Sequence, residues 1–150
     1  MSSAKALVLD ASVLFGWFAN CRTTAPALAL LEATTVEQRL APDLVLIELL
    51  NAGWKSHRAG VITTEQFEAM ATHTPQLLGA IVPSGELLEA AWRWCTILDH
   101  PAYDCLYLAL AERRQAPLIT ADQRLLQRLN NLGAPSDLAI DLNAWALPIA

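Results

Sequence analysis

Short apolar runs alternate along the chain with longer segments of helical periodicity. A continuous run of three or four apolar or β-branched residues, bounded by polar or turn-forming residues, is typical of a parallel strand buried on both faces. Such runs predict strands at residues 6–9, 80–82 and 117–120, with an edge strand at 138–142. The chain therefore contains the strands of a small sheet.

The segments between these runs have the spacing of helices, which are predicted at residues 13–18, 25–33, 44–57, 64–78, 85–98, 102–114 and 123–132. Thr63 and Gln66 have the spacing of a capping box, and Ser84 is placed to cap the helix that follows it. Gly133 is a stop signal for the last helix. Residues 34–39 are interpreted as a polar linker.

Strands that alternate with helices predict an α/β fold, with a central, mostly parallel sheet flanked by helices. The length of 150 residues and the 54% hydrophobic composition predict one folded domain over residues 1–150. The longest uncharged stretch, residues 69–85, contains His73, Pro75 and Pro83, so no membrane span is expected. The absence of a long apolar N-terminal run and of a C-x-x-C pair favours a cytoplasmic protein.

Two acidic residues follow predicted strands. Asp10 comes directly after the first strand and Asp122 follows the strand at 117–120. In open α/β sheets, ligands bind beyond the carboxyl ends of the strands. Each residue alone is also explained as the N-cap of the next helix.

Two further acids lie inside apolar helical segments. Glu48 has apolar neighbours from four residues before it to two after it, and no Lys or Arg lies within four residues. Asp104 precedes the run Cys-Leu-Tyr-Leu-Ala-Leu-Ala and shares a helical stripe with Leu108 and Ala111. A buried carboxylate requires a partner or a metal ion. The alternatives are partial exposure or a distant arginine.

Convergence of the four acids would require a cation between them, because their mutual repulsion opposes full ionisation. Carboxylate oxygens favour Mg²⁺, with Mn²⁺ as an alternative. Such a cage is typical of phosphodiester hydrolysis. The net charge of -5 argues against a broad basic surface, so any contact with nucleic acid must be local.

Four motifs together carry a family resemblance: Val-Leu-Asp-Ala-Ser-Val-Leu at 8–14, Glu-Leu-Leu-Asn at 48–51, Tyr-Asp-Cys-Leu-Tyr-Leu-Ala-Leu-Ala at 103–111 and Leu-Ile-Thr-Ala-Asp at 118–122. In order and spacing the chain resembles the PIN-domain family of metal-dependent nucleases, most closely the VapC-type toxins. The resemblance implies a PIN-like three-layer sandwich. It also implies an endoribonuclease that is the toxin of a bacterial type II toxin–antitoxin pair.

The resemblance further implies site residues: Asp10, Glu48, Asp104 and Asp122 as catalytic metal ligands, and Ser12, Asn51 and Thr120 as supporting residues. Ser12 is equally explained as a helix cap, Asn51 as a partner of backbone and Thr120 as a strand residue. The next acids after Asp122 are Asp137 and Asp141, which leaves open whether one or two metal ions bind.

Contacts with RNA and with proteins are expected at other positions. Candidate phosphate contacts are Arg113, Arg114, Arg124 and Arg128, which are otherwise solvated helix residues. The expected partners are RNA, a cognate antitoxin that inserts an arginine into the site, and a second copy in a homodimer. Five tryptophans and the aromatic-rich segment 15–18 favour interfaces. Because Trp92 and Trp94 cannot share one helix face, at least one is expected at the surface.

Two other functions are weighed against the nuclease. A PIN-like interaction module with weak catalysis would bind partners only, and the intact acidic set argues against it. An aspartyl-phosphate phosphatase would have a second Asp where Ser12 stands, and a receiver would have a lysine near a late strand. The only lysines are Lys5 and Lys55.

Overall fold

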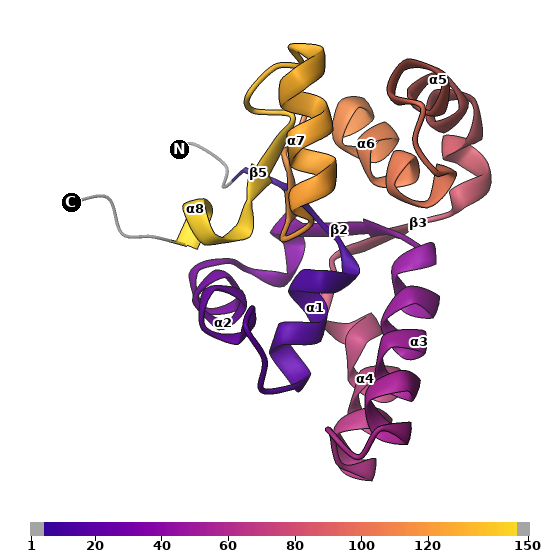
Figure 1. The fold of residues 1–150 in the computed structure, drawn as a ribbon. Coiled ribbons are helices and arrows are strands. Elements are labelled where there is room, and N and C mark those ends of the chain that lie inside the picture. Colours follow the sequence, from indigo (N-terminus) through magenta and orange to yellow (C-terminus); the bar gives the residue numbers. More distant parts are fainter. Residues whose placement is uncertain (1–4, 147–150) are drawn as a thin grey trace.

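A five-stranded parallel sheet forms the centre of the computed structural model, which describes residues 5–146 (Figure 1). The strands are β1 (Leu7–Leu9), β2 (Arg39–Pro42), β3 (Ala80–Val82), β4 (Leu118–Thr120) and β5 (Ala139–Asp141). Their order in the sheet is β3-β2-β1-β4-β5, and every neighbouring pair is parallel. The first strand of the chain therefore lies at the centre, with its carboxyl end beside that of β4.

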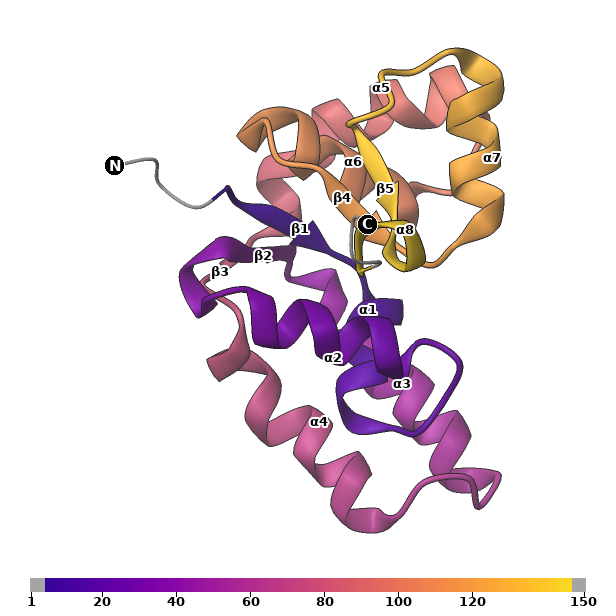
Figure 2. The same ribbon diagram turned by 90° about the vertical axis from the view of Figure 1, so that its left-hand side faces the viewer.

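Helices cover both faces of the sheet, as Figures 1 and 2 show. On one face lie α1 (Ala11–Phe18), α2 (Thr24–Ala33), α3 (Leu44–Arg58) and α4 (Thr64–Leu77). On the other lie α5 (Leu88–Leu98), α6 (Ala102–Arg114) and α7 (Gln123–Leu132), and α8 (Leu142–Ala146) packs against α2. The predicted three-layer α/β fold is confirmed. Among residues 5–146, every helix is too short or too polar to cross a membrane.

Burial on both faces explains why the strands are continuous apolar runs. All three residues of β1 are buried, as is the whole segment from Cys105 to Ala111 in α6. Gly53 allows α3 and α4 to pack closely, because a Cβ at this position would lie 2.5 Å from the Met70 sulfur. The predicted capping box at Thr63 and Gln66 begins α4.

Two local predictions are wrong. The segment predicted as a linker, residues 34–39, contains the 3-10 turn Val36–Gln38 and the first residue of β2, Arg39, which is buried. Ser84 does not cap α5, because Ser84–Leu87 form another 3-10 turn and the Ser84 N–H donates to Asp43 Oδ1 (3.1 Å). The short helix α8 was not predicted. In each case tertiary contacts or hydrogen bonds, rather than local propensity, decide the structure.

Candidate active site

Two of the predicted acids lie at the carboxyl ends of adjacent strands. Asp10 directly follows β1, and Asp122 follows β4 after one intervening residue. Each caps the next helix: Asp10 Oδ1 accepts from the Ser12 N–H (3.0 Å), and Asp122 Oδ1 accepts from the Arg124 N–H (3.0 Å). The prediction that Asp10 and Asp122 are N-caps of the following helices is therefore confirmed. Capping uses mainly one oxygen of each carboxylate and does not exclude a second role.

Two hydroxyl groups join the ends of these strands. Thr120, which is fully buried, donates its hydroxyl proton to Asp10 Oδ2 and accepts the Asp122 N–H (3.0 Å). Ser12 donates to Asp10 Oδ1 (2.5 Å) and accepts the Ala121 N–H (3.2 Å). Both hydroxyls thus orient Asp10 and link β1 to the turn after β4.

Glu48 and Asp104 reach the same edge from opposite faces of the sheet, on α3 and α6. Tyr107, on the same helix as Asp104, is 1% exposed and donates its hydroxyl to Glu48 Oε1 (2.5 Å), which joins α6 to α3. Burial raises the pKa of Glu48 above its usual value, and the charge of Asp104 raises it further. Asn51 is exposed, one turn along α3 from Glu48.

The charges of three of the acids, Asp10, Glu48 and Asp104, act on one another or on Tyr107. Burial raises the pKa of Asp10 to about 6, although hydrogen bonds from Ser12 and Thr120 partly oppose the shift. The pKa of Tyr107 is raised by burial and by the charges of Glu48, Asp10 and Asp104. The Tyr107 hydroxyl therefore lies in the negative field of these three carboxylates, and it is in direct contact with Glu48. We call Asp10, Glu48, Asp104 and Asp122 the acidic cluster.

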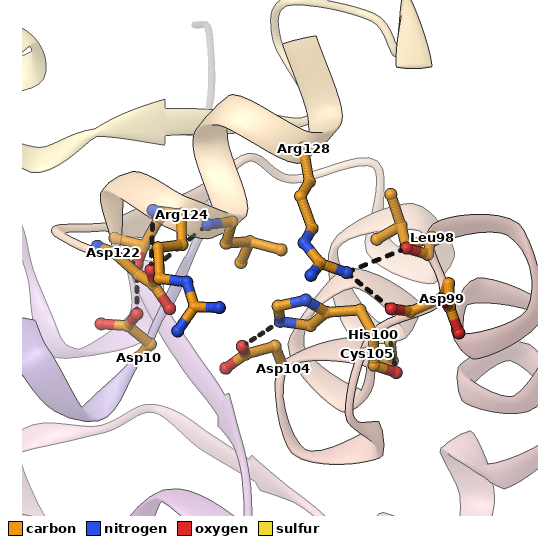
Figure 3. A network of polar contacts seen from close by, with 11 residues as sticks. Asp10, Leu98, Asp99, His100, Asp104, Cys105, Asp122, Arg124 and Arg128 are labelled. Atoms are coloured by element: carbon orange, nitrogen blue, oxygen red, sulfur yellow. Dashed lines mark hydrogen bonds and ion pairs between the residues drawn. The ribbon is translucent and has the colours of Figure 1, made fainter. Parts of the chain in front are cut away.

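A hydrogen-bonded network supports the Asp104 side of the cluster (Figure 3). His100 Nε2 lies 2.5 Å from Asp104 Oδ2, and the His100 side chain is 9% exposed. The Arg128 guanidinium, on α7, donates to the carbonyl oxygens of Leu98 (3.2 Å) and Asp99 (2.6 Å). Helix α7 therefore holds the turn that carries His100 toward Asp104.

Two residues of this site were not identified from the sequence. Tyr107 lies within an apolar run typical of helix core, and His100 lies in the break before α6. The available signal was the spacing from Asp104. Tyr107 follows Asp104 by three residues, which is the separation of neighbours on a helix face, and His100 precedes it by four, just before the helix begins.

The four candidate arginines do not lie together. Arg124 is exposed, and Figure 3 shows its guanidinium directed toward the space among Asp10, Asp122 and Asp104. Arg113 and Arg114 lie at the opposite end of α6 from Asp104, roughly 14 Å away along the helix axis.

The arginines at the far end of α6 have other surroundings. Arg113 Nη2 pairs with Glu86 Oε1 (3.4 Å). Arg114 lines a surface pocket of about 1080 Å³ together with Lys5, Leu7 and Pro117. These last residues mark the amino ends of β1 and β4, so the pocket and the acidic cluster lie at opposite edges of the sheet.

The donor set suits a divalent cation. No three His, Cys, Asp or Glu side chains within residues 5–146 are close enough together to enclose one ion as they stand. Mg²⁺, however, usually keeps several waters and binds through one or two carboxylates plus substrate phosphates. The cluster offers only oxygen ligands from four half-buried carboxylates, and this chemistry fits Mg²⁺ or Mn²⁺.

The profile of the PIN domain family matches residues 7–132 of this chain. PAE2754 from Pyrobaculum aerophilum has a similar fold (TM-score 0.66, 22% identity, 95% of this chain and 87% of that chain). So do FitAB bound to an IR36 DNA fragment (TM-score 0.68, 14% identity, 95% and 98%) and a toxin–antitoxin complex from Klebsiella pneumoniae (TM-score 0.58, 21% identity, 79% and 88%). No curated protein matches the sequence.

Proposed function

The chain belongs to the PIN domain family, whose members are in general nucleases, and from this premise we propose that it is a metal-dependent endoribonuclease. We further propose that it is one nuclease domain and the toxin of a type II toxin–antitoxin pair. The observation that carries the proposal is the acidic cluster, in which four separate elements direct carboxylates to one edge of the sheet. An endoribonuclease acts where RNA is, which favours the cytoplasm.

Asp10, Glu48, Asp104 and Asp122 would hold Mg²⁺ or Mn²⁺. A bound divalent cation neutralises charge on a phosphate and lowers the pKa of water. The protein's own part is orientation: Ser12 and Thr120 fix Asp10, Tyr107 fixes Glu48, and His100 lies against Asp104. These contacts support preorganised carboxylates rather than side chains that must be ordered when substrate binds.

Arg124 is the residue best placed to contact an RNA phosphate beside the cluster, because its exposed guanidinium points toward the acids (Figure 3). Without the four acids the formal charge of -5 becomes -1, so the rest of the surface is nearly neutral toward a polyanion. Arg128 is bound to backbone carbonyls, and Arg113 to Glu86. The proposal therefore assigns substrate contact to Arg124 only.

The decisive test is cleavage of a total RNA pool with EDTA, Mg²⁺ or Mn²⁺, comparing the parent protein with Asp104→Asn. We expect metal-dependent cleavage that the substitution reduces by about 100-fold or more. Asp43→Asn is the control, since Asp43 is an exposed acid bonded to Ser84 outside the cluster. Cleavage in EDTA, or undiminished cleavage by Asp104→Asn, would contradict the mechanism. Antitoxin binding without any cleavage would favour the interaction module.

The proposed protein partners are an antitoxin, whose inserted arginine would pair with the acidic cluster, and a second copy of this chain. The expectation that residues 15–18 provide an interface is not supported, because Phe15, Trp17 and Phe18 pack against the core. Exposed apolar side chains lie elsewhere: Ile47 and Trp54 on α3, and Leu88 and Trp92 on α5. Trp94 is buried, so the expected difference between Trp92 and Trp94 is confirmed.

The exposed faces of α3 and α5 favour a homodimer. Light scattering at micromolar concentration tests this part of the proposal, and a monomer mass would contradict it.

A further inference from the structure

The hydrogen bonds to Glu48 and Asp122 are divided unevenly between the two oxygens of each carboxylate. Glu48 Oε1 accepts the Tyr107 hydroxyl, whereas Oε2 accepts nothing from residues 5–146. In Asp122, Oδ1 accepts the backbone N–H groups of Arg124 and Leu125, and Oδ2 is likewise free of hydrogen bonds from the described chain. In Glu48 and Asp122 the protein thus occupies one oxygen and leaves the other available, whereas both oxygens of Asp10 accept hydrogen bonds.

This division matters for the choice of cation. Ca²⁺ takes six to eight oxygen ligands and often binds a carboxylate through both oxygens. Mg²⁺ is smaller, requires near-octahedral geometry and is bound through few carboxylates, with water as the remaining ligands. A carboxylate with one oxygen already bound to a protein donor is therefore better suited to Mg²⁺ than to Ca²⁺.

Resting on the proposed metal-dependent function, we propose that Tyr107 sets the metal preference of the site. By occupying Oε1 of Glu48, its hydroxyl leaves a single oxygen for a cation and so favours Mg²⁺ and Mn²⁺ over Ca²⁺. Tyr107 acts through Glu48 and is a positioning residue.

Tyr107 is well placed for this role. Its side chain is buried in α6 among core residues, so the ring cannot swing away from α3 without opening the packing. The hydroxyl also joins α3 to α6 across the sheet edge, and this contact fixes the Glu48 carboxylate before a cation binds.

The test compares Mg²⁺ and Ca²⁺ affinities of the full chain without RNA, each measured by displacement of Mn²⁺ detected by electron paramagnetic resonance. In Tyr107→Phe we expect the Mg²⁺ affinity to fall by about tenfold while the Ca²⁺ affinity is kept or rises. Thr74→Val removes another buried hydroxyl, which donates to the Met70 carbonyl oxygen in α4 (2.6 Å). It should lower stability and leave the ratio of the two affinities unchanged.

Two further variants separate the possible outcomes. Glu48→Asp withdraws the carboxylate from the hydroxyl while keeping Tyr107, and should reproduce the loss of preference even where Tyr107→Phe folds poorly. In a Glu48→Gln background, Tyr107→Phe should no longer change the ratio. An unchanged ratio in folded Tyr107→Phe, with Mn²⁺ bound by the parent, overturns this inference alone. A parent protein that binds no Mn²⁺ overturns the proposed function as well.

Discussion

The two ends of the parallel sheet bury opposite charges in different ways. At the amino end, Arg39 begins β2 and is 3% exposed. At the carboxyl end, the acidic cluster collects beyond β1 and β4. Within the part of the chain that the structure describes, neither Arg39 nor any member of the acidic cluster belongs to a Lys–carboxylate or Arg–carboxylate pair. The buried charge of Arg39 serves the structure, whereas the charges of the acidic cluster are proposed to bind a ligand.

At the amino end the buried charge is hydrogen-bonded to acceptors of the protein itself. The Arg39 guanidinium donates to the carbonyl oxygens of Leu77 (2.8 Å), Leu31 (3.3 Å) and Thr34 (3.2 Å), and to the Thr34 hydroxyl (3.0 Å). These acceptors lie at the carboxyl ends of α2 and α4, where helix dipoles favour a cation. The guanidinium carbon also lies 5.6 Å from the centre of the Trp17 ring. Both Nε and Nη1 are thus directed to the protein itself.

At the carboxyl end the charge is only partly compensated. Neutral hydroxyls, backbone N–H groups and His100 contact the four acids, and burial raises the pKa values of Asp10 and Glu48. Burial also lowers the pKa of Arg39, so both edges carry a desolvation cost, but at the carboxyl edge the charge of Asp104 adds repulsion to the cost of burying Glu48. Such repulsion is characteristic of a site that a ligand completes.

The largest expected effect on stability comes from removing the buried guanidinium at the amino end of the sheet. Arg39→Met should lower the free energy of unfolding by about 3–5 kcal/mol, because it leaves buried carbonyl oxygens of α2 and α4 without donors. Urea denaturation measures the change. Arg93→Met is the control: Arg93 pairs with Glu112 at the surface, and its loss should cost less than about 1 kcal/mol. Equal effects of the two substitutions on the free energy of unfolding would contradict the structural role assigned to Arg39.

A pH series on the metal-free protein probes the other end. The pKa of Asp10 is about 6 in the folded state against 3.8 for the ordinary side chain, so between these values the folded state binds more protons than the unfolded chain. Its contribution to stability is therefore present below pH 4 and is lost as the pH rises to 6, by up to about 3 kcal/mol. The raised pKa of Glu48 acts in the same direction. Urea denaturation in EDTA from pH 4 to 8 measures the loss.

Asp10→Asn isolates the contribution of this residue. The variant resembles the protonated form, so it should match the parent near pH 4 and exceed it in stability at pH 7.5, while RNA cleavage is lost. A difference between variant and parent that does not change with pH would show that Asp10 is not the source.

The smallest expected effects separate two arginines on one face of α7. Arg124→Gln should weaken binding of an uncleavable RNA analogue by about tenfold and lower the salt slope by about one, as for the loss of one phosphate contact. Arg128→Gln should leave the salt slope unchanged and cost about 1–2 kcal/mol of stability, because the Leu98 and Asp99 carbonyls lose their donor. Fluorescence anisotropy and urea denaturation measure the two effects. If instead Arg128→Gln weakened RNA binding and Arg124→Gln lowered stability, Arg128 would be the phosphate contact and Arg124 the structural residue.

The residues at the carboxyl end of the sheet are easier to predict from the sequence than those at the amino end. Asp10 follows an apolar strand, and Glu48 interrupts an apolar helix, so local pattern alone marks both as unusual. The three-layer fold follows from the same alternation of strands and helices. These signals are local. In the structure Asp10 and Asp122 follow the carboxyl ends of β1 and β4, and Glu48 and Asp104 lie on helices that flank the sheet.

The amino end depends on contacts that no local pattern contains. Arg39 begins a strand of only four residues that ends in Pro42, and its partners lie up to 38 residues away. A charged residue in a polar neighbourhood therefore indicates a linker, although the residue is buried. Tyr107 is hidden for the opposite reason, since its apolar neighbours indicate core and only its distant partner Glu48 shows a further role.

The central position of β1 also sets the order in which the site can form during synthesis. β1 is made early in the domain, and the Thr120 hydroxyl that contacts Asp10 is 110 residues further along the chain. A growing chain therefore contains Asp10 while these residues are synthesised, still without β4, Asp122 or the helix that Asp122 caps. The proposed nuclease site can be complete only after Asp122 has been synthesised, and an inhibitor is required only from that moment.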